Sequence, residues 1–185
     1  MFFRIIAVII LAVLVISVFS FRYPLKYLDI IVKNTDIYGL DPALICAVIH
    51  AESKFAEEAV SRKGASGLMQ ITESTGDWMA EQMGLPDYSF DEIFEPSLNI
   101  SIGCRYLSWL LNRYESVDSA VAAYNAGSGN VDKWLKNPMY SADGKNLDNI
   151  PFKETRDYVR RVRVNKLIYD FILHNKGSKK LFGEN

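Results

Sequence analysis

Residues that commonly bind metals or form disulfides are scarce in this chain. His50 and His174 are its only histidines, and Cys46 and Cys104 are its only cysteines. None of the four has a His or Cys partner at the spacing of a zinc site, so the sequence predicts neither a metal nor another cofactor. Both cysteines fall within apolar helical patterns. This favours two buried free thiols, although an exported protein would permit a disulfide between them.

The chain also lacks a large net charge of either sign. Its 21 lysines and arginines nearly balance its 22 aspartates and glutamates, giving a formal net charge of -1. Without a broad cationic field, nucleic acid is not an expected partner. We expect the short basic runs Arg160–Arg161 and Lys179–Lys180 to form solvated surface, the latter in a frayed tail.

Alternating strand patterns, internal repeats and low-complexity linkers are absent as well. The 185 residues, 49% of them hydrophobic, suit one globular domain with a small appendage. Beyond Phe21 the apolar residues recur at helical intervals. The sequence therefore predicts an all-α fold, with one helical domain over 22–185 and a separate segment over 1–21.

That separate segment is strongly apolar. From Ile5 to Phe21 it carries no charge, and its length is close to the lower limit of about 17 to 20 residues needed to cross a bilayer. The letters "VFS" before Phe21 are a poor match to a signal-peptidase site. We therefore predict an uncleaved membrane-spanning anchor, with a cleaved signal peptide as the alternative.

Capping residues mark the expected helix boundaries. Gly39 ends one helix, and Asp41 followed by Pro42 begins the next, as an N-cap with proline at the first helical position. Further helices are expected over Thr72–Met83, from Pro96 to about Leu111, over 117–126 and over 130–137. A last helix is expected from Pro151 onward. Its apolar face would consist of Val159, Val162, Leu167, Ile168 and Phe171.

One acid interrupts an apolar helical face. Steps of four and three residues from Val48 and Ile49 both reach Glu52. A carboxyl group held away from water has a raised pKa and stays protonated near neutral pH, as the general acid of a glycosidase must. The alternative is an ordinary surface acid or a member of an ion pair.

Four blocks of the sequence decide between these interpretations: "AVIHAESKF", "AVSRKGASGLMQIT", "AAYNAGSGNVDKWL" and "IPFKETRDYVRRV". Together, and in this order, they resemble the SLT-type soluble lytic transglycosylases, relatives of goose-type lysozyme that cleave bacterial peptidoglycan. The resemblance covers nearly all of the chain beyond about Tyr23. It implies a lysozyme-like helical domain acting on peptidoglycan glycan strands, with the domain on the extracytoplasmic side of the membrane.

The resemblance also implies roles for individual residues. Glu52, in the Glu-Ser pair, would be the catalytic acid and base. The substrate-binding positions would be Ser61, Gly64, Gly67, Gln70, Tyr124, Asn125, Glu154 and Tyr158, the glycines letting the backbone approach the sugar closely. One departure is visible, because Thr72 and Glu73 stand where many members of the family have methionine and proline. Glutamate and proline both suit the first turn of a helix, so the departure does not put the fold in doubt.

The implied reaction needs a single carboxyl group. Glu52 would protonate the oxygen between N-acetylmuramic acid and N-acetylglucosamine, then deprotonate the C6 hydroxyl of the same muramic residue to close a 1,6-anhydro ring. Two alternatives stay open. One is a hydrolytic muramidase that uses a second acid, for which Asp77, Asp91 and Glu95 are the candidates. The other is a non-catalytic peptidoglycan-binding scaffold, which the presence of Glu52 disfavours.

Overall fold

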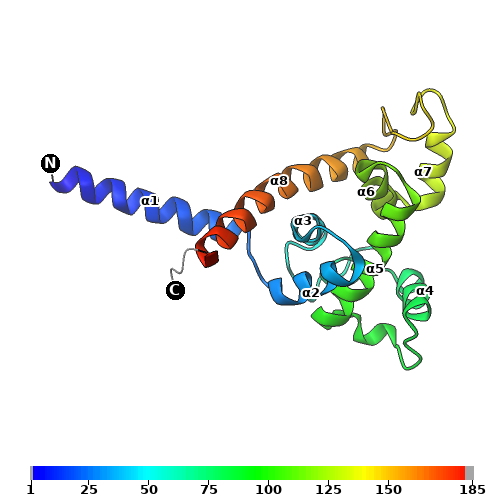
Figure 1. Cartoon of the computed structure of the whole chain (residues 1–185), viewed down its shortest axis with the longest axis horizontal. Helices are drawn as coiled ribbons and strands as arrows, with labels where there is room; N and C mark the ends of the chain where they lie inside the picture. The colour runs from blue at the N-terminus through cyan, green and yellow to red at the C-terminus, as the bar shows by residue number, and fades with distance from the viewer. Residues whose placement is uncertain (1, 182–185) are drawn as a thin grey trace.

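A computed structural model describes the backbone of residues 2–181, and the side chains of residues 4–6, 9–11, 13, 14 and 17–175. Within this part of the chain every regular element is helical (Figure 1). The extended pairing that occurs is limited to isolated bridges of Ser66 with Val60 and with Ile71. The predicted all-α fold is confirmed.

Helix α1, Phe2–Arg22, projects away from the other helices (Figure 1). Its described apolar side chains are exposed: Ile5, Ile6, Ile9, Ile10, Leu11, Val13, Leu14, Val18, Phe19 and Phe21. Within the described residues, however, no helix is both long enough and apolar enough to cross a membrane. The predicted membrane-spanning segment at Ile5–Phe21 is therefore unsupported by the structure.

Helix α2, Leu28–Tyr38, ends and helix α3, Pro42–Glu52, begins where the capping residues predict. Gly39 ends α2 in the left-handed conformation, with a φ of 65°. The Asp41 side chain accepts a hydrogen bond of 2.8 Å from the backbone N–H of Ala43 and so caps the start of α3. The sequence signals for this helix pair are thus confirmed.

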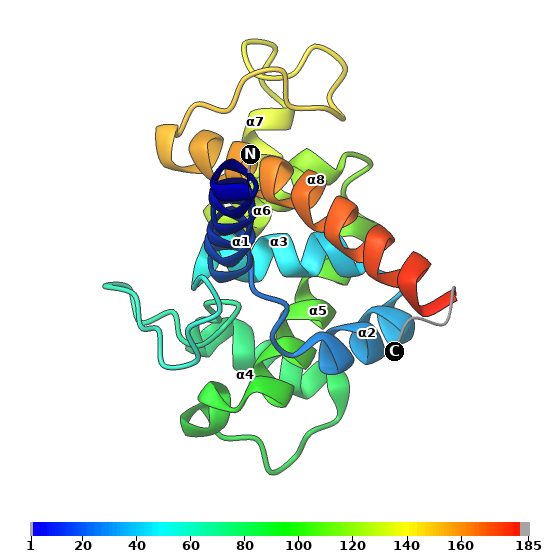
Figure 2. The same cartoon turned by 90° about the vertical axis from the view of Figure 1, so that its left-hand side faces the viewer.

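The central helix of the domain is α3. Its residues 43–50 are all buried, on every side of the helix. Its main packing partner is α8, Lys153–Leu181, which crosses it, and α2 covers another side (Figure 2). The expectation that α3 has one apolar and one polar face is wrong, because neighbouring elements surround the helix.

The remaining helices form the other side of the domain. In chain order they are α4 (Glu73–Met83), the 3₁₀ helix η1 (Phe90–Phe94), α5 (Pro96–Arg113), α6 (Val117–Ala126) and α7 (Ser128–Leu135). Helix α5 contacts α2, α4, η1 and α6. Thr72 and Gly84 cap the two ends of α4, as predicted.

Helix α8 differs from its prediction in extent and in orientation. It begins at Lys153, two residues later than Pro151, and its backbone stays helical through the expected frayed tail as far as Leu181. Val159 and Val162 are buried as expected, but Leu167 and Phe171 are 66% and 67% exposed. The helix instead packs inward through its polar and aromatic side, which includes Tyr158, Asn165 and Tyr169.

Both cysteines are buried and free, as the sequence favours. Burial raises the pKa of the Cys46 thiol to about 12 and also raises that of Cys104. Among the described residues no group of three or more potential ligands could hold a metal ion.

Candidate active site

Glu52 ends the buried helix α3 and keeps only part of its surface exposed. Burial raises the pKa of its carboxyl group from 4.5 to about 7, against the opposing effects of Tyr158 and Arg161. The charge of Glu154 raises this pKa further. Because desolvation is the largest cause, a substantial share of these carboxyl groups holds a proton near neutral pH.

Tyr158, on α8, faces this carboxyl group. The side chain is buried, and its interaction with Glu52 lowers the pKa of the acid. Within the described residues, however, the phenol oxygen makes no hydrogen bond of regular geometry. Burial and the nearby Glu52 raise the pKa of the phenol well above its ordinary value. Tyr158 is thus a neutral donor positioned to tighten its contact with the carboxylate form of Glu52.

The first turns of α8 bring both signs of charge to Glu52. Glu154, Tyr158 and Arg161 are spaced at i, i+4 and i+7, so they share one side of the helix. The guanidinium carbon of Arg161 lies 5.8 Å from the centre of the Tyr158 ring. The charge of Arg161 favours ionisation of Glu52, and that of Glu154 opposes it.

Tyr124, on α6, approaches the acid from the other side. Its hydroxyl donates a hydrogen bond of 2.9 Å to the backbone carbonyl of Met69. Burial first, and then the charge of Glu52, raises the pKa of this phenol well above its ordinary value. The expectation that this tyrosine lies near the acid agrees with their electrostatic interaction.

The chain turns sharply directly after Glu52. The hydroxyl of Ser53 donates to the carbonyl of Leu68 over 2.7 Å and accepts from the backbone N–H of Phe55 over 3.2 Å. Lys54 and Phe55 then have positive φ angles of 54° and 66°. Backbone strain of this kind is usual beside functional sites and persists only where surrounding contacts enforce it.

Ser61 and Gly67 stabilise the loop between α3 and α4. The Ser61 hydroxyl accepts from the backbone N–H of Ala65, over 3.0 Å, so it closes its own turn. Gly67 is buried with a φ of 78°, and a Cβ atom there would lie 2.2 Å from the side-chain nitrogen of Asn99. Packing against Asn99 by itself excludes a side chain at Gly67, and the approach of a sugar to this glycine stays a prediction.

Gln70, Tyr124 and Asn125 line a shared hollow of about 250 Å³. The side-chain amide of Gln70 donates to the carbonyls of Ala59 and Gly67, over 2.9 and 3.0 Å. The side-chain oxygen of Asn125 accepts from the Thr155 hydroxyl over 2.8 Å. The hollow also includes Ile71, Thr72, Thr75, Tyr106, Ala126 and Gly127. Amide, hydroxyl and aromatic groups together suit a saccharide.

Asn99, on α5, organises this site and has no counterpart among the predicted residues. It is completely buried. Its side-chain oxygen accepts from the N–H of Met69 over 2.7 Å, and its side-chain nitrogen donates to the carbonyls of Ser66 and Ile93. Asparagine within the apolar pattern of α5 is the sequence signal that could have identified it, because a buried amide needs hydrogen-bond partners.

The structure therefore brings three of the predicted residues, Tyr124, Glu154 and Tyr158, together around Glu52. Gln70 and Asn125 line the hollow that Tyr124 shares, whereas Ser61 and Gly67 support the loop. Chemically, the arrangement can deliver a proton from Glu52 to a ligand bound beside it and can then stabilise the carboxylate through Tyr158 and Arg161.

Comparison with known families agrees with the motifs. A family model described as "Transglycosylase SLT domain" matches residues 29–147. This range includes Glu52 and Tyr124 but ends before α8.

Comparison with curated proteins finds similarity over a larger share of the chain. The chain is 36% identical over 163 residues to the soluble lytic murein transglycosylase of Salmonella typhimurium, covering 86% of this chain and 25% of the relative. It is also 36% identical over 129 residues to the membrane-bound lytic murein transglycosylase C of Shigella sonnei, covering 63% of this chain and 35% of the relative. The chain thus spans about a quarter to a third of the length of these relatives.

Solved structures share the fold. An inactive mutant of the lytic transglycosylase Slt from Pseudomonas aeruginosa matches with a TM-score of 0.74 and 32% identity, covering 84% of this chain and 25% of that one. The 70 kDa soluble lytic transglycosylase of Escherichia coli matches with a TM-score of 0.71 and 30% identity, covering 82% of this chain and 25% of that one. The lysozyme-like arrangement predicted from the motifs is therefore confirmed.

Proposed function

The chain belongs to the transglycosylase SLT domain family, and from this premise we propose that it is a lytic transglycosylase that cleaves peptidoglycan glycan strands. The observation that carries the proposal is the raised pKa of Glu52, about 7, together with its electrostatic interaction with Tyr124, which lines a polar hollow. An acid in this state can protonate the oxygen of a glycosidic bond at neutral pH. The relatives with similar sequences are named for the same chemistry.

Proton transfer from Glu52 is the first step that we propose. The proton moves to the oxygen that joins N-acetylmuramic acid to N-acetylglucosamine as that bond breaks, leaving positive charge at C1 of the muramic residue. The carboxylate that forms is stabilised by the Tyr158 hydroxyl and the charge of Arg161, both of which lower the pKa of Glu52. Gln70 and Asn125 are positioned to orient the sugar from the adjoining hollow.

Closure of a 1,6-anhydro ring is the second step. The Glu52 carboxylate removes the proton from the C6 hydroxyl of the same muramic residue, and the oxygen bonds to C1. This restores the protonated acid and consumes no water. One carboxyl group therefore suffices, whereas hydrolases ordinarily use two.

A hydrolytic muramidase would need a second acid, and the three candidates from the sequence offer weak support for one. Asp77 and Asp91 are exposed, and Glu95 caps α5 by accepting from the N–H of Ser97. None of the three perturbs the pKa of Glu52, whereas the charge of Glu154 does. Glu154 is accordingly the better candidate for placing a water molecule. A scaffold without catalysis would have no use for a desolvated acid with a raised pKa.

Two matched variants test these roles. Glu52→Gln keeps the shape of the side chain but removes the proton, so glycan release from purified sacculi should fall by at least about 10²-fold. Glu154→Gln should retain activity within about tenfold if Glu154 only shapes the electrostatics of the site. Near-normal turnover by a folded Glu52→Gln protein would refute the role of Glu52. If Glu154→Gln loses as much activity as Glu52→Gln, that result would favour the hydrolytic mechanism.

We further propose that the segment 1–21 attaches the domain to a membrane, with the domain on the extracytoplasmic side. The support is an uncharged run from Ile5 to Phe21 and a helix whose described apolar side chains face solvent. Some relatives are named membrane-bound. A cleaved signal peptide remains the competing explanation.

Extraction of the full chain from membranes tests the attachment. An inserted segment should resist high salt and alkaline carbonate and should need detergent for release. Release by salt alone would indicate a helix lying on the membrane surface. Mature protein that begins at or after Phe21 in the extracellular fluid would show that the segment is a cleaved signal.

A further inference from the structure

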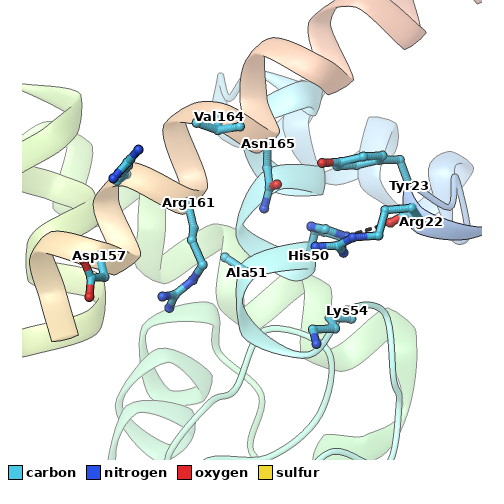
Figure 3. A pocket seen from close by; sticks show the side chains of 10 residues that line it. Arg22, Tyr23, His50, Ala51, Lys54, Asp157, Arg161, Val164 and Asn165 are labelled. Carbon is cyan, nitrogen blue, oxygen red and sulfur yellow. Dashed lines mark hydrogen bonds between the residues drawn. The ribbon is translucent and has the colours of Figure 1, made fainter. Parts of the chain in front are cut away.

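A cationic pocket of about 480 Å³ lies where α1 joins the domain (Figure 3), and it shares no lining residue with the hollow around Tyr124. It is formed by the end of α1, the end of α3 and the middle of α8. Four basic side chains line it: Arg22, Lys54, Arg160 and Arg161. The other lining residues are Tyr23, His50, Ala51, Asp157, Val164 and Asn165.

The positive charge of this pocket is only partly offset within the described part of the chain, where Arg161 interacts with Glu52 and Asp157. Its one lining acid, Asp157, forms an ion pair of 2.6 Å with Lys153, which is not a lining residue. None of the four basic side chains forms an ion pair with a described carboxylate. Several unpaired cations around one cavity favour an anionic ligand.

Arg22 and His50 form the inner wall of the pocket. The Arg22 guanidinium lies 2.8 Å from Nε2 of His50, and the same ring nitrogen lies 2.8 Å from the Arg22 carbonyl (Figure 3). Burial is the largest influence on the His50 ring and lowers its pKa. These contacts hold the Arg22 guanidinium group against the His50 ring, at the C-terminal end of α1.

The outer surface of α8 carries an apolar stripe beside this pocket. Val164, Leu167 and Phe171 are 48%, 66% and 67% exposed, and their spacing of three and four residues places them on one side of the helix. Arg160 precedes Val164 by four residues, so its positive charge lies on the same side of the helix. A basic cluster adjoining exposed aliphatic and aromatic side chains is typical of helices that lie at a membrane interface.

Contacts fix this surface near α1. The Tyr23 ring packs edge-on against the Tyr169 ring with centres 5.9 Å apart, and the Tyr169 hydroxyl donates to the carbonyl of Pro24 over 3.2 Å. The C-terminal half of α8 consequently lies on the side of the domain from which α1 projects (Figure 1). If α1 enters a membrane, the pocket and the stripe are at the membrane-proximal end.

We propose that this pocket binds the phosphate of an anionic phospholipid headgroup, while Val164, Leu167 and Phe171 rest in the membrane interface. The proposal rests on the membrane attachment by α1 proposed above. Lys54, Arg160 and Arg161 supply charge complementary to an anionic headgroup, and the stripe supplies the apolar contact that a soluble anion would not need. Since Ala51 and Arg161 line the pocket and flank Glu52, such docking would hold the catalytic acid close to the membrane surface.

Lipid binding to the detergent-solubilised full chain tests the pocket. We expect short-chain phosphatidylglycerol to bind more tightly than short-chain phosphatidylcholine in a calorimetric titration. The double variant Lys54→Gln/Arg160→Gln should lose roughly tenfold or more of the affinity for phosphatidylglycerol. The matched control Lys33→Gln/Lys133→Gln removes the same charge from exposed positions on α2 and α7 and should bind like the wild type.

Two results would overturn the proposal. One is equal binding of the two lipids. The other is a pocket variant that binds phosphatidylglycerol normally but loses affinity for a soluble muropeptide, which would assign the pocket to the glycan substrate. Glycan cleavage and membrane extraction of the same proteins report separately on the activity and on α1, so failure of either is distinguishable from failure of the lipid site.

A spin label tests the stripe. Cys46 and Cys104 are buried, so a cysteine introduced at Leu167 is the accessible thiol among the described residues. In nanodiscs that contain phosphatidylglycerol, a label on Leu167→Cys should be more accessible to oxygen than to a water-soluble nickel complex. A label on Met139→Cys, in the loop after α7 on the side opposite α1, should show the reverse (Figure 1). Equal water accessibility at both positions would contradict the docking.

Discussion

The hydroxyl of Tyr124 donates a hydrogen bond of 2.9 Å to the carbonyl of Met69, while the N–H of Met69 donates to the side chain of Asn99 over 2.7 Å. The backbone of Met69, in the loop after the acid, is therefore held on both sides of its Cα atom, from α5 and from α6. Because the tyrosine hydroxyl is already used as a donor, its role is to position the loop and to exclude water near Glu52, and it is not a free proton source.

Tyr124→Phe should show this positioning role. The ring contacts remain, but the buried Met69 carbonyl loses its partner, which costs about 1 to 3 kcal/mol. We expect a lower unfolding midpoint in urea and a severalfold lower kcat, with a smaller change in KM. Tyr140→Phe is the matched control for stability, because Tyr140 is a partly buried tyrosine outside this loop. An unchanged midpoint and an unchanged kcat in Tyr124→Phe would contradict this role.

Tyr158→Phe should change the pH dependence of activity. Activity requires protonated Glu52, so it should fall as the pH rises through about 7. The Tyr158 hydroxyl lowers the pKa of Glu52, and its removal should move this alkaline limb to higher pH. Tyr169→Phe is the control, because that buried hydroxyl bonds to Pro24 instead. A limb that stays in place in Tyr158→Phe would show that the phenol does not act on the acid.

Glu52→Gln should stabilise the fold at alkaline pH. The carboxyl group ionises near pH 4.5 when unfolded but near pH 7 when folded, so the unfolded chain binds fewer protons between these values. Glu52 therefore destabilises the protein increasingly as the pH rises from about 4.5 to 7. Unfolding in urea should show a gain for Glu52→Gln of about 1 to 3 kcal/mol at pH 8 and little at pH 4. An equal effect at both pH values would argue against a raised pKa.

Two glycines of one loop should respond differently to alanine. Gly64 and Gly67 have φ angles of 79° and 78°, so either substitution costs about 1 to 2 kcal/mol through the backbone. At Gly67 the new Cβ would also lie 2.2 Å from the Asn99 side chain and 2.9 Å from the Ile93 carbonyl, whereas at Gly64 it meets nothing within 4 Å. Gly67→Ala should lower the unfolding midpoint clearly more than Gly64→Ala. Equal losses would contradict the packing account.

Local signals in the sequence were sufficient for the helices whose boundaries depend on capping. Asp41, Pro42, Thr72 and Gly84 act through their own backbone neighbours, so α3 begins where predicted, and α4 both begins and ends where predicted. The inward side of α8 was predicted incorrectly at Leu167 and Phe171 because apolar periodicity alone cannot distinguish a side that packs on a core from one that faces another apolar environment.

Within the site, the sequence identified the acid and the tyrosines but not their supports. The motif marked Glu52, Tyr124 and Tyr158, which the structure places together. Asn99 was missed because its partners, Met69 and Ser66, are about thirty residues away along the chain. Contacts of this range are set by the packing of α5 against the loop, and no local pattern contains them.

Digestion of purified sacculi in ¹⁸O-water tests the central claim most directly, since the account assigns the cleavage to one acid and an internal nucleophile. A C6 hydroxyl held near C1 can act at an effective concentration of about 10⁵ M or more, far above that of water. Mass spectrometry of the released muropeptides should therefore find 1,6-anhydromuramoyl ends that carry no label. Incorporation of ¹⁸O at C1 of most new ends would contradict the account, because it would show that water attacks the intermediate.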